Sequence, residues 1–178
     1  MEKWQTGDMD AFEALFRQHE RLVFSNAYLI TGSKEEAEDV LQEVFFSVWK
    51  SRHTFNPEKG KLTTWLHRIT VNQCMRRQRK KQPAVRSLDS LEPRERQRLE
   101  GREEVLVNYQ KYDRLLEAMN SLDSKHRSVL VLRYFNDLSY DEVAQALSIP
   151  LGTVKSRINQ ALRSLREQVG TQQSEAST

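Results

Sequence analysis

The segment 139–165 constrains the fold most, because it has the pattern of two short helices joined by a tight turn. Ser139 and Glu142 have the spacing of a capping box, and Pro150 suits the first turn of the following helix. On a helical wheel the apolar residues of this second helix fall within an arc of about 80°: Leu151, Val154, Ile158, Leu162 and Leu165. The pattern is that of a helix-turn-helix and predicts a small helical domain.

The polar side of the second helix indicates DNA as its ligand. Between positions 151 and 166 there are four basic residues and no acidic residue. Lys, Ser, Asn and Gln side chains can contact base edges in a major groove, and they gather on one side together with Arg163: Lys155, Ser156, Asn159 and Gln160. The alternative is an amphipathic surface helix whose charges are only solvated.

Composition favours a soluble protein rich in helix. The 178 residues include 30% charged residues, six Gly and four Pro, with a mean hydropathy of −0.73 and a net charge of +3. No apolar run approaches the roughly 18 residues that span a bilayer, and the first residues lack a signal-peptide core, so we expect a cytoplasmic protein.

The single cysteine, Cys74, excludes an internal disulfide, and we expect it to pack in a helix instead of acting as a reactive thiol.

Capping signals predict three helices in the first part of the chain. The first would cover about 20 residues up to Thr31-Gly32, the second would end near Ser51, and the third would continue to Lys81. The signals for their starts are the pair Asp10 and Glu13, the pair Ser33 and Glu36, and Thr63 or Thr64.

The chain changes character after position 81. Residues 82–112 contain Pro83 and Pro93, alternate in charge sign and hold few large apolar groups, which is typical of a flexible tether. A second helical domain, 113–168, would include a helix capped by Ser124 and the helix-turn-helix, and 169–178 would be a disordered tail. We therefore expect an all-α protein with two small helical domains, 7–81 and 113–168, joined by a flexible polar linker.

Charge is segregated within the first domain. Ten Lys or Arg residues and a single acid, Glu58, lie between positions 44 and 81. Five acids crowd the helix before them, and because they would repel DNA phosphates they indicate a protein partner with a basic surface: Glu35, Glu36, Glu38, Asp39 and Glu43. Phe46 lies on this polar face and is a candidate interface anchor. The alternative is that Phe46 packs under the loop after His53.

The third helix combines aromatic, amide and basic side chains on one side. Trp65, Arg68, Asn72 and Arg76 share this side, and Phe55 and His67 lie close in sequence. Such a surface suits unpaired bases, because rings stack on bases while cations hold the phosphates. The alternative is that Trp65 belongs to the core. The basic run 76–81, which includes Arg77, should attract phosphates without reading sequence.

Catalytic and metal-binding patterns are missing from the sequence. It contains no Gly-rich phosphate loop and no His-Glu-x-x-His motif. The four histidines are scattered without ligand spacing: His19, His53, His67 and His126. We expect no cofactor, no metal and no enzymatic activity.

Together these features resemble the extracytoplasmic-function (ECF, group 4) RNA polymerase sigma factors, which keep only sigma regions two and four. The resemblance covers residues 7–168 and depends on four motifs in this order. They are Gly7-Asp8 with Ala11-Phe12, the run 37–45 with Trp49, the run 65–69 with Asn72, and the run 152–157.

The resemblance implies roles for particular residues. The docking surface for the polymerase largest subunit would comprise Asp39, Gln42, Glu43 and Phe46. The surface for the minus-ten element would comprise Phe55, Trp65, His67, Arg68, Asn72, Arg76 and Arg77, with a pocket for a flipped base at Phe55, His67 and Asn72. The minus-thirty-five element would meet Arg133, Thr153, Lys155, Ser156, Arg157, Asn159, Gln160 and Arg163. Arg76 departs from the family, because relatives often have an acid there.

The implied function is promoter-specific transcription initiation. The partners would be bacterial core RNA polymerase, promoter DNA in duplex and single-stranded form, and an anti-sigma factor, in many relatives a membrane-anchored one. The rival hypotheses are a dimeric helix-turn-helix transcription factor that does not melt DNA, an adaptor that mimics a sigma factor, and a nuclease. The first would need an α/β receiver or a ligand pocket in the first half, the second would lose the basic surface, and the third lacks metal carboxylates.

Overall fold

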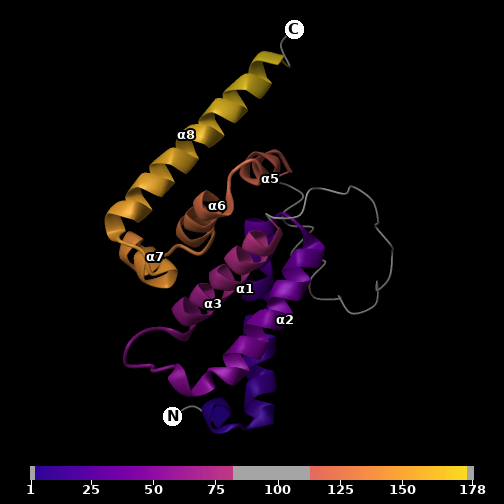
Figure 1. Cartoon of the computed structure of the whole chain (residues 1–178), viewed down its shortest axis with the longest axis vertical. Helices are drawn as coiled ribbons and strands as arrows, with labels where there is room; N and C mark the ends of the chain where they lie inside the picture. The colour runs from indigo at the N-terminus through magenta and orange to yellow at the C-terminus, as the bar shows by residue number, and fades with distance from the viewer. Residues whose placement is uncertain (1–2, 82–112, 176–178) are drawn as a thin grey trace.

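A computed structural model shows helices joined by turns and loops, and it describes residues 3–81 and 113–175, with side chains described for 3–79 and 116–168 (Figure 1). The expected linker 82–112 lies outside the described residues. The first part consists of η1 (Lys3–Thr6), α1 (Met9–Thr31), α2 (Lys34–Lys50), η2 (Arg52–Thr54) and α3 (Leu62–Lys81). The second part consists of α5 (Asp113–Asn120), α6 (Ser124–Leu130), η3 (Val131–Phe135), α7 (Tyr140–Leu147) and α8 (Leu151–Glu175).

The start of α1 differs from the prediction by two residues. Asp8, and not Asp10, is the N-cap, since its carboxylate accepts a hydrogen bond of 3.0 Å from the Ala11 amide. Asp10 instead lies in the first turn, where a negative charge interacts favourably with the helix dipole. The predicted stop is confirmed, because Gly32 adopts φ 74° and its amide donates to the Tyr28 carbonyl.

The other caps are partly as predicted. Ser33 caps α2 as expected, by accepting a hydrogen bond from the Glu36 amide. Helix α3 begins at Leu62, so the prediction of a cap at Thr63 or Thr64 was wrong. The cap of α6 is Asp123 instead of Ser124, because an Asp accepts amide hydrogen bonds at least as well as a Ser and stands one position earlier.

The three helices of the first part pack around fully buried side chains, among them Phe24, Ile30, Leu41 and Leu66. The short helix η1 adds a buried tryptophan, Trp4, beneath the loop that leads into α3. The η1 segment was not predicted, because four residues are too few for a periodic pattern.

The helix-turn-helix is confirmed. Ser139 and Glu142 form a reciprocal capping box at the start of α7, with hydrogen bonds of 2.9 and 3.2 Å. In α8 the side chains of Val154 and Ile158 are buried as predicted. Helix α8 also continues through 169–175, where a disordered tail was expected. No proline stands there, and a single glycine, Gly170, weakens a helix without ending it.

The two parts pack against each other. Helices α6 and α7 lie on α1 and α3, and one apolar cluster includes buried residues of both parts, such as Val71 and Val143 (Figure 1). At the end of α1, a Cβ atom on Gly32 would lie 2.3 Å from the Asn120 Oδ1 atom, so only glycine allows this close approach. The connection between α6 and α7 passes through η3, a π-helical turn that the sequence analysis did not predict.

Candidate functional site

The polar face of α2 carries an exposed aromatic ring. The Phe46 side chain is 61% exposed, and the Lys50 ammonium lies 4.5 Å from the centre of its ring. The alternative, that Phe46 packs under the following loop, is therefore wrong. Gln42 is also exposed on this helix, so an apolar group stands among polar side chains in a position to contact another protein.

Two carboxylates of this face have an internal partner. The Arg77 guanidinium binds Asp39 at 2.5 Å and Glu43 at 2.9 Å. Arg77 thus lies on the α2 side of α3, and its side chain is only 24% exposed. In the sequence, Arg77 belongs to the basic run 76–81 and is therefore predicted to bind DNA, because nothing local to such a run shows which helix one of its residues faces.

Phe55 and Trp65 lie together in the loop before α3 and at its start. Their ring centroids are 5.4 Å apart, and the Trp4 ring lies 6.0 Å from Phe55 and 6.2 Å from Trp65. Phe55 is buried and Trp65 is half-buried, so the ring of Trp65 belongs partly to the apolar cluster. Gln5 fixes the loop by donating hydrogen bonds to the carbonyls of Arg52 and Phe55, a positioning role that sequence reasoning missed.

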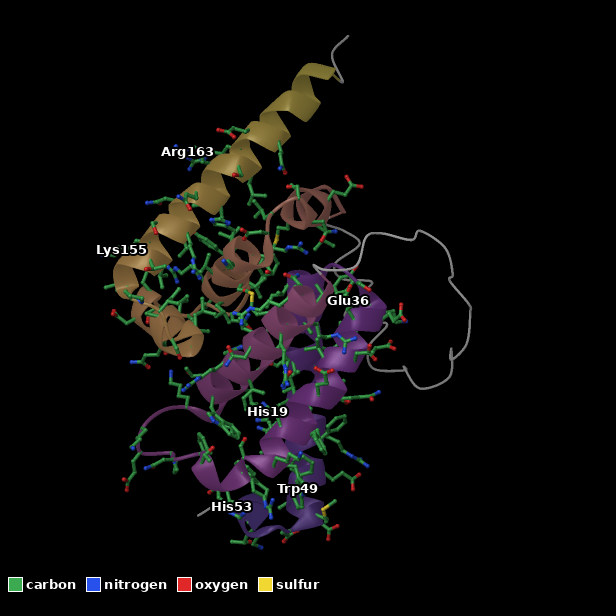
Figure 2. All side chains as sticks on the ribbon, viewed as in Figure 1. His19, Glu36, Trp49, His53, Lys155 and Arg163 are labelled. Carbon is green, nitrogen blue, oxygen red and sulfur yellow. The ribbon has the colours of Figure 1, made fainter. Side chains whose placement is uncertain are left out.

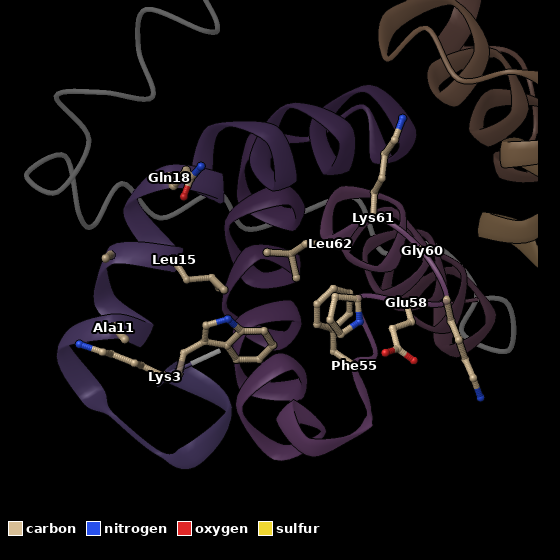
Figure 3. Close-up of a pocket in the computed structure, with 13 residues that line it drawn as sticks. Lys3, Ala11, Leu15, Gln18, Phe55, Glu58, Gly60, Lys61 and Leu62 are labelled. Carbon is tan, nitrogen blue, oxygen red and sulfur yellow. The ribbon is translucent and has the colours of Figure 1, made fainter. Parts of the chain in front are cut away.

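Two cavities meet at this loop and share four lining residues, Phe55, Lys59, Gly60 and Lys61. One of about 930 Å³ extends towards η1 and α1 and is lined by Lys3 and Leu15 as well (Figure 3). The other, of about 640 Å³, is lined by Phe55, Trp65, Arg68 and neighbouring loop residues, and also by Glu142, Gln145 and Ala146 of α7. Helix α7 therefore covers one side of this second cavity, where Phe55 of the predicted base pocket lies. Lys61 of the loop also forms an exposed ion pair with Glu142 of α7 at 3.5 Å.

His67 is separated from this pocket by burial. Its side chain is 3% exposed, and its Nδ1 atom lies 2.8 Å from the Asn26 side-chain amide. Asn26 Oδ1 in turn accepts a hydrogen bond from Asn136 of the second part, so its Nδ2 atom is the donor to His67. Burial lowers the pKa of His67 to about 4, and the ring is neutral with its proton on Nε2.

Asn72 and Arg76 are exposed further along α3. They do not lie near Phe55 but line a third cavity, between α3 and the second part of the chain. Arg157 of α8 lines the same cavity. The structure thus brings together residues that the sequence analysis assigned to two different promoter elements.

The outer face of α8 presents the predicted base-reading side chains. Figure 2 shows Lys155 and Arg163 on the side of α8 away from α1–α3. Ser156, Asn159 and Gln160 are exposed as well, whereas Thr153 and Arg157 are half-exposed. Arg133 belongs to η3, where its guanidinium donates to the Leu138 carbonyl at 3.1 Å and lies over the Tyr134 and Tyr140 rings.

Reactive or metal-binding chemistry does not appear in the described part of the chain. Cys74 is fully buried, and burial raises the pKa of its thiol to about 12, which fits a packing role. Within 3–81 and 113–175, no group of His, Cys, Asp and Glu side chains could hold a metal ion. Over the same residues, no helix is both long and apolar enough to cross a membrane.

Comparison with known families identifies both parts. Residues 15–84 match Sigma-70 region 2, and residues 118–167 match Sigma-70 region 4. The chain is 32% identical over 171 residues to the ECF RNA polymerase sigma factor SigW of Bacillus subtilis, with coverage of 92% of this chain and 91% of SigW. The chain belongs to the ECF RNA polymerase sigma factors. A second ECF sigma factor, SigE of Mycolicibacterium smegmatis, is 33% identical and covers 96% of this chain and 67% of SigE.

Solved structures confirm the fold of this sigma factor. CnrH, in a complex with the cytosolic domain of CnrY, superposes with a TM-score of 0.66 at 22% identity over 94% of this chain and 92% of CnrH. RpoE of Bartonella quintana, in a complex with the anti-sigma factor NepR, gives a TM-score of 0.65 at 20% identity over 89% and 96% of the two chains.

Family membership defines the general function of the chain. As an ECF sigma factor it is a transcription regulator that acts with core RNA polymerase to start transcription at particular promoters. The predicted all-α fold with regions two and four is confirmed.

Proposed function

We propose that Asp39, Gln42, Glu43 and Phe46 form the surface that binds core RNA polymerase. The observation that carries this proposal is the 61% exposure of the Phe46 ring on an acidic helix face. An exposed aromatic group surrounded by charged side chains is the usual composition of an interface centre with a polar rim. When a basic surface of the polymerase binds, it would displace the Arg77 guanidinium from one or both of the Asp39 and Glu43 carboxylates.

We propose that α8 reads the minus-thirty-five element. Its exposed Lys155, Ser156, Asn159 and Gln160 side chains would contact base edges in the major groove, and Arg163 would add a further cation at the same face. Thr153, Arg157 and Arg133 would hold phosphates. The capping box of Ser139 and Glu142 fixes the start of α7, the first helix of this motif.

The minus-ten element would be captured as single strand at the loop before α3. Phe55 and Trp65 supply rings for a base, and Arg68 supplies charge for the strand. Because α7 lines the same cavity, this capture requires α7 to move away. His67 is buried and hydrogen-bonded to Asn26, so it could contact a base only after a rearrangement that exposes its ring.

Promoter geometry gives an independent reason for the opening. The two elements lie about 25 base pairs apart, which is roughly 85 Å at ~3.4 Å per base pair. Yet Asn72, proposed to bind the minus-ten element, and Arg157, proposed to bind the minus-thirty-five element, line the same cavity. We therefore propose that the described arrangement is a closed state and that the two domains separate in the promoter-bound state. A tether between them then raises the local concentration of the second domain once the first has bound.

An anti-sigma factor is the expected regulator. Two sigma factors of the same fold were solved in complexes with such regulatory chains, CnrY and NepR. We propose that a comparable protein, membrane-anchored or soluble, binds this chain, and that the sigma factor itself works in the cytoplasm without catalysing a reaction.

Transcription with purified core enzyme on genomic DNA tests the proposed function. Adding the chain should produce transcripts whose 5′ ends cluster downstream of one shared pair of promoter elements. Substituting Lys155→Ala should weaken promoters according to the sequence of the upstream element. Transcripts with unclustered 5′ ends, or no increase over core enzyme alone, would contradict the proposal.

A further inference from the structure

The third cavity, between α3 and the second domain, has a volume of about 480 Å³. It is lined by four cationic side chains, Arg76 and Arg79 of α3, Lys125 of α6 and Arg157 of α8. No Asp or Glu is among the described residues that line it. Four cations around one cavity repel one another, so the cavity is an electropositive site.

Within residues 3–81 and 113–175, the four cations of this cavity have no carboxylate partner. Their neighbour Arg77 shows the contrast, since it binds Asp39 and Glu43 on the opposite side of the same helix. An anion bound in the cavity would supply the compensating charge that these residues lack.

The other residues that line the cavity are mostly apolar. Val71 is buried, and Met75, Leu147 and Ile149 are half-buried around the same volume. Asn72 adds an amide that can pair with a polar edge. The volume falls within the 300–1,000 Å³ typical of small-molecule sites. A lining that combines cationic and apolar side chains suits a ligand with phosphoryl groups attached to a flat ring system.

We propose that this cavity binds a nucleotide, with the phosphoryl groups against Arg76, Arg79, Lys125 and Arg157 and the base against Met75 and Ile149. Two sources share this chemistry, a free nucleoside triphosphate and the 5′-phosphorylated end of a single strand. Both would bridge α3 and α8 and so hold the two domains together. This consequence for regulation rests on the proposed function, whereas the binding itself does not.

The cavity exists only in the closed state. Lys125 lies on α6 and Arg157 on α8, so two of its four cations move away from α3 when the domains separate. Bound nucleotide therefore favours the closed state in proportion to its affinity, and promoter DNA competes with it.

Calorimetric titration of the full chain tests the proposal, with ATP, inorganic pyrophosphate, adenosine and a 5′-phosphorylated dinucleotide at one ionic strength. We expect ATP to bind more tightly than pyrophosphate, and adenosine to bind weakly. The double variant Arg79→Ser and Lys125→Ser should weaken ATP binding about tenfold or more, because each removes a charge-assisted contact. Lys125 lies outside the proposed polymerase and promoter surfaces, whereas Arg79 belongs to the basic run 76–81, so the readout of this variant is ATP binding and not transcription.

The matched control is Arg17→Ser with Arg166→Ser, which removes the same charge from exposed positions outside the cavity. This variant should keep the affinity for ATP within about twofold of the wild type.

Three results would each overturn the proposal: no ATP binding at millimolar concentration, an equal loss of affinity in both double variants, or pyrophosphate that binds as tightly as ATP. Tighter binding of the dinucleotide than of ATP supports it and assigns a strand end as the source. Polymerase is absent from this titration, so its failure is distinct from a failure of promoter-directed transcription.

Discussion

The Asn136 side-chain amide donates a hydrogen bond of 2.7 Å to Asn26 Oδ1, across 110 positions of the chain. Asn26 is 2% exposed and donates in turn to His67 at 2.8 Å. A residue of the second domain is thereby linked through a buried amide to a histidine of α3. This chain of buried polar groups joins the two domains, and because a buried polar group is costly without its partner, it helps to specify how the domains fit together.

Asn136→Ala should weaken the closed state. The substitution removes the donor to Asn26 and leaves a buried oxygen without its partner, which costs about 1–3 kcal/mol. Single-molecule fluorescence transfer between dyes on Gln18→Cys and Arg166→Cys should show a larger fraction of separated domains. The native Cys74 is fully buried and does not compete for the dyes.

Lys61→Ala is the comparison for this experiment. It removes another polar contact across the domains, an ion pair whose side chains are 77% and 34% exposed. Exposed pairs contribute less than about 1 kcal/mol, so the distribution should change little. Equal effects of the two substitutions would contradict the assignment of Asn136 as the main polar link.

Stability should depend on the ionisation of His67. Its pKa is about 4 in the folded chain and about 6.5 when unfolded, because burial disfavours the charged ring. The unfolded chain therefore binds the proton more readily. The contribution of neutral His67 to the free energy of unfolding is therefore fully present above pH 6.5 and is lost as the pH falls towards 4. The total change in unfolding free energy over this range is about 3 kcal/mol.

Urea unfolding between pH 4 and 7 measures this dependence. His67→Gln should flatten the rise of unfolding free energy with pH, whereas His53→Gln, at an exposed position, should leave it unchanged. Curves of the same slope for the wild type and His67→Gln would show that the ring titrates freely in the folded protein.

The sequence predicted the elements whose signals are local. The capping box of Ser139 and Glu142 lies within four residues of α7, and the apolar stripe of α8 repeats with the helical period, so both were predicted correctly. The α1 and α6 caps were missed by one or two positions, because two good cap residues, such as Asp8 and Asp10, stand close together and only the turn before the helix decides between them.

Long-range contacts could not be predicted in this way. The bond between Asn26 and Asn136 and the ion pairs of Arg77 join residues on different helices. A single sequence shows the face of its own helix on which a residue lies, but not which neighbour packs there. The same limit applies to His67, whose type suggests an accessible site residue although the fold buries it.

Arg77→Ala tests whether this arginine serves the acidic face or DNA. Because its guanidinium is held by Asp39 and Glu43, the substitution should leave the salt dependence of single-strand DNA binding nearly unchanged. Arg76→Ala, at the exposed neighbouring position, should reduce the salt slope by about one. Fluorescence anisotropy on a labelled oligonucleotide at several salt concentrations gives both slopes. A reduced slope for Arg77→Ala would assign that residue to DNA.

Phe46→Ala should weaken binding to core polymerase while leaving the stability of the fold nearly unchanged. The ring is 61% exposed, so unfolding free energy should change by less than about 0.5 kcal/mol. Binding to core polymerase should weaken by about 2 kcal/mol, or roughly thirtyfold, if the ring is an interface anchor. Met9→Ala is the control, because Met9 has the same 61% exposure and lies at the start of α1. Equal affinities of the two variants would exclude Phe46 as an anchor.

The most direct measurement is the affinity of the double variant Asp39→Lys and Glu43→Lys for core RNA polymerase. Titration of dye-labelled protein with core enzyme should show a loss of at least about a hundredfold, because like charges then face the basic partner surface. The control, Glu58→Lys with Glu117→Lys, makes the same change in net charge at exposed positions outside α2 and should bind as the wild type does. Wild-type affinity of the Asp39→Lys and Glu43→Lys variant would contradict the proposed role of the acidic face of α2.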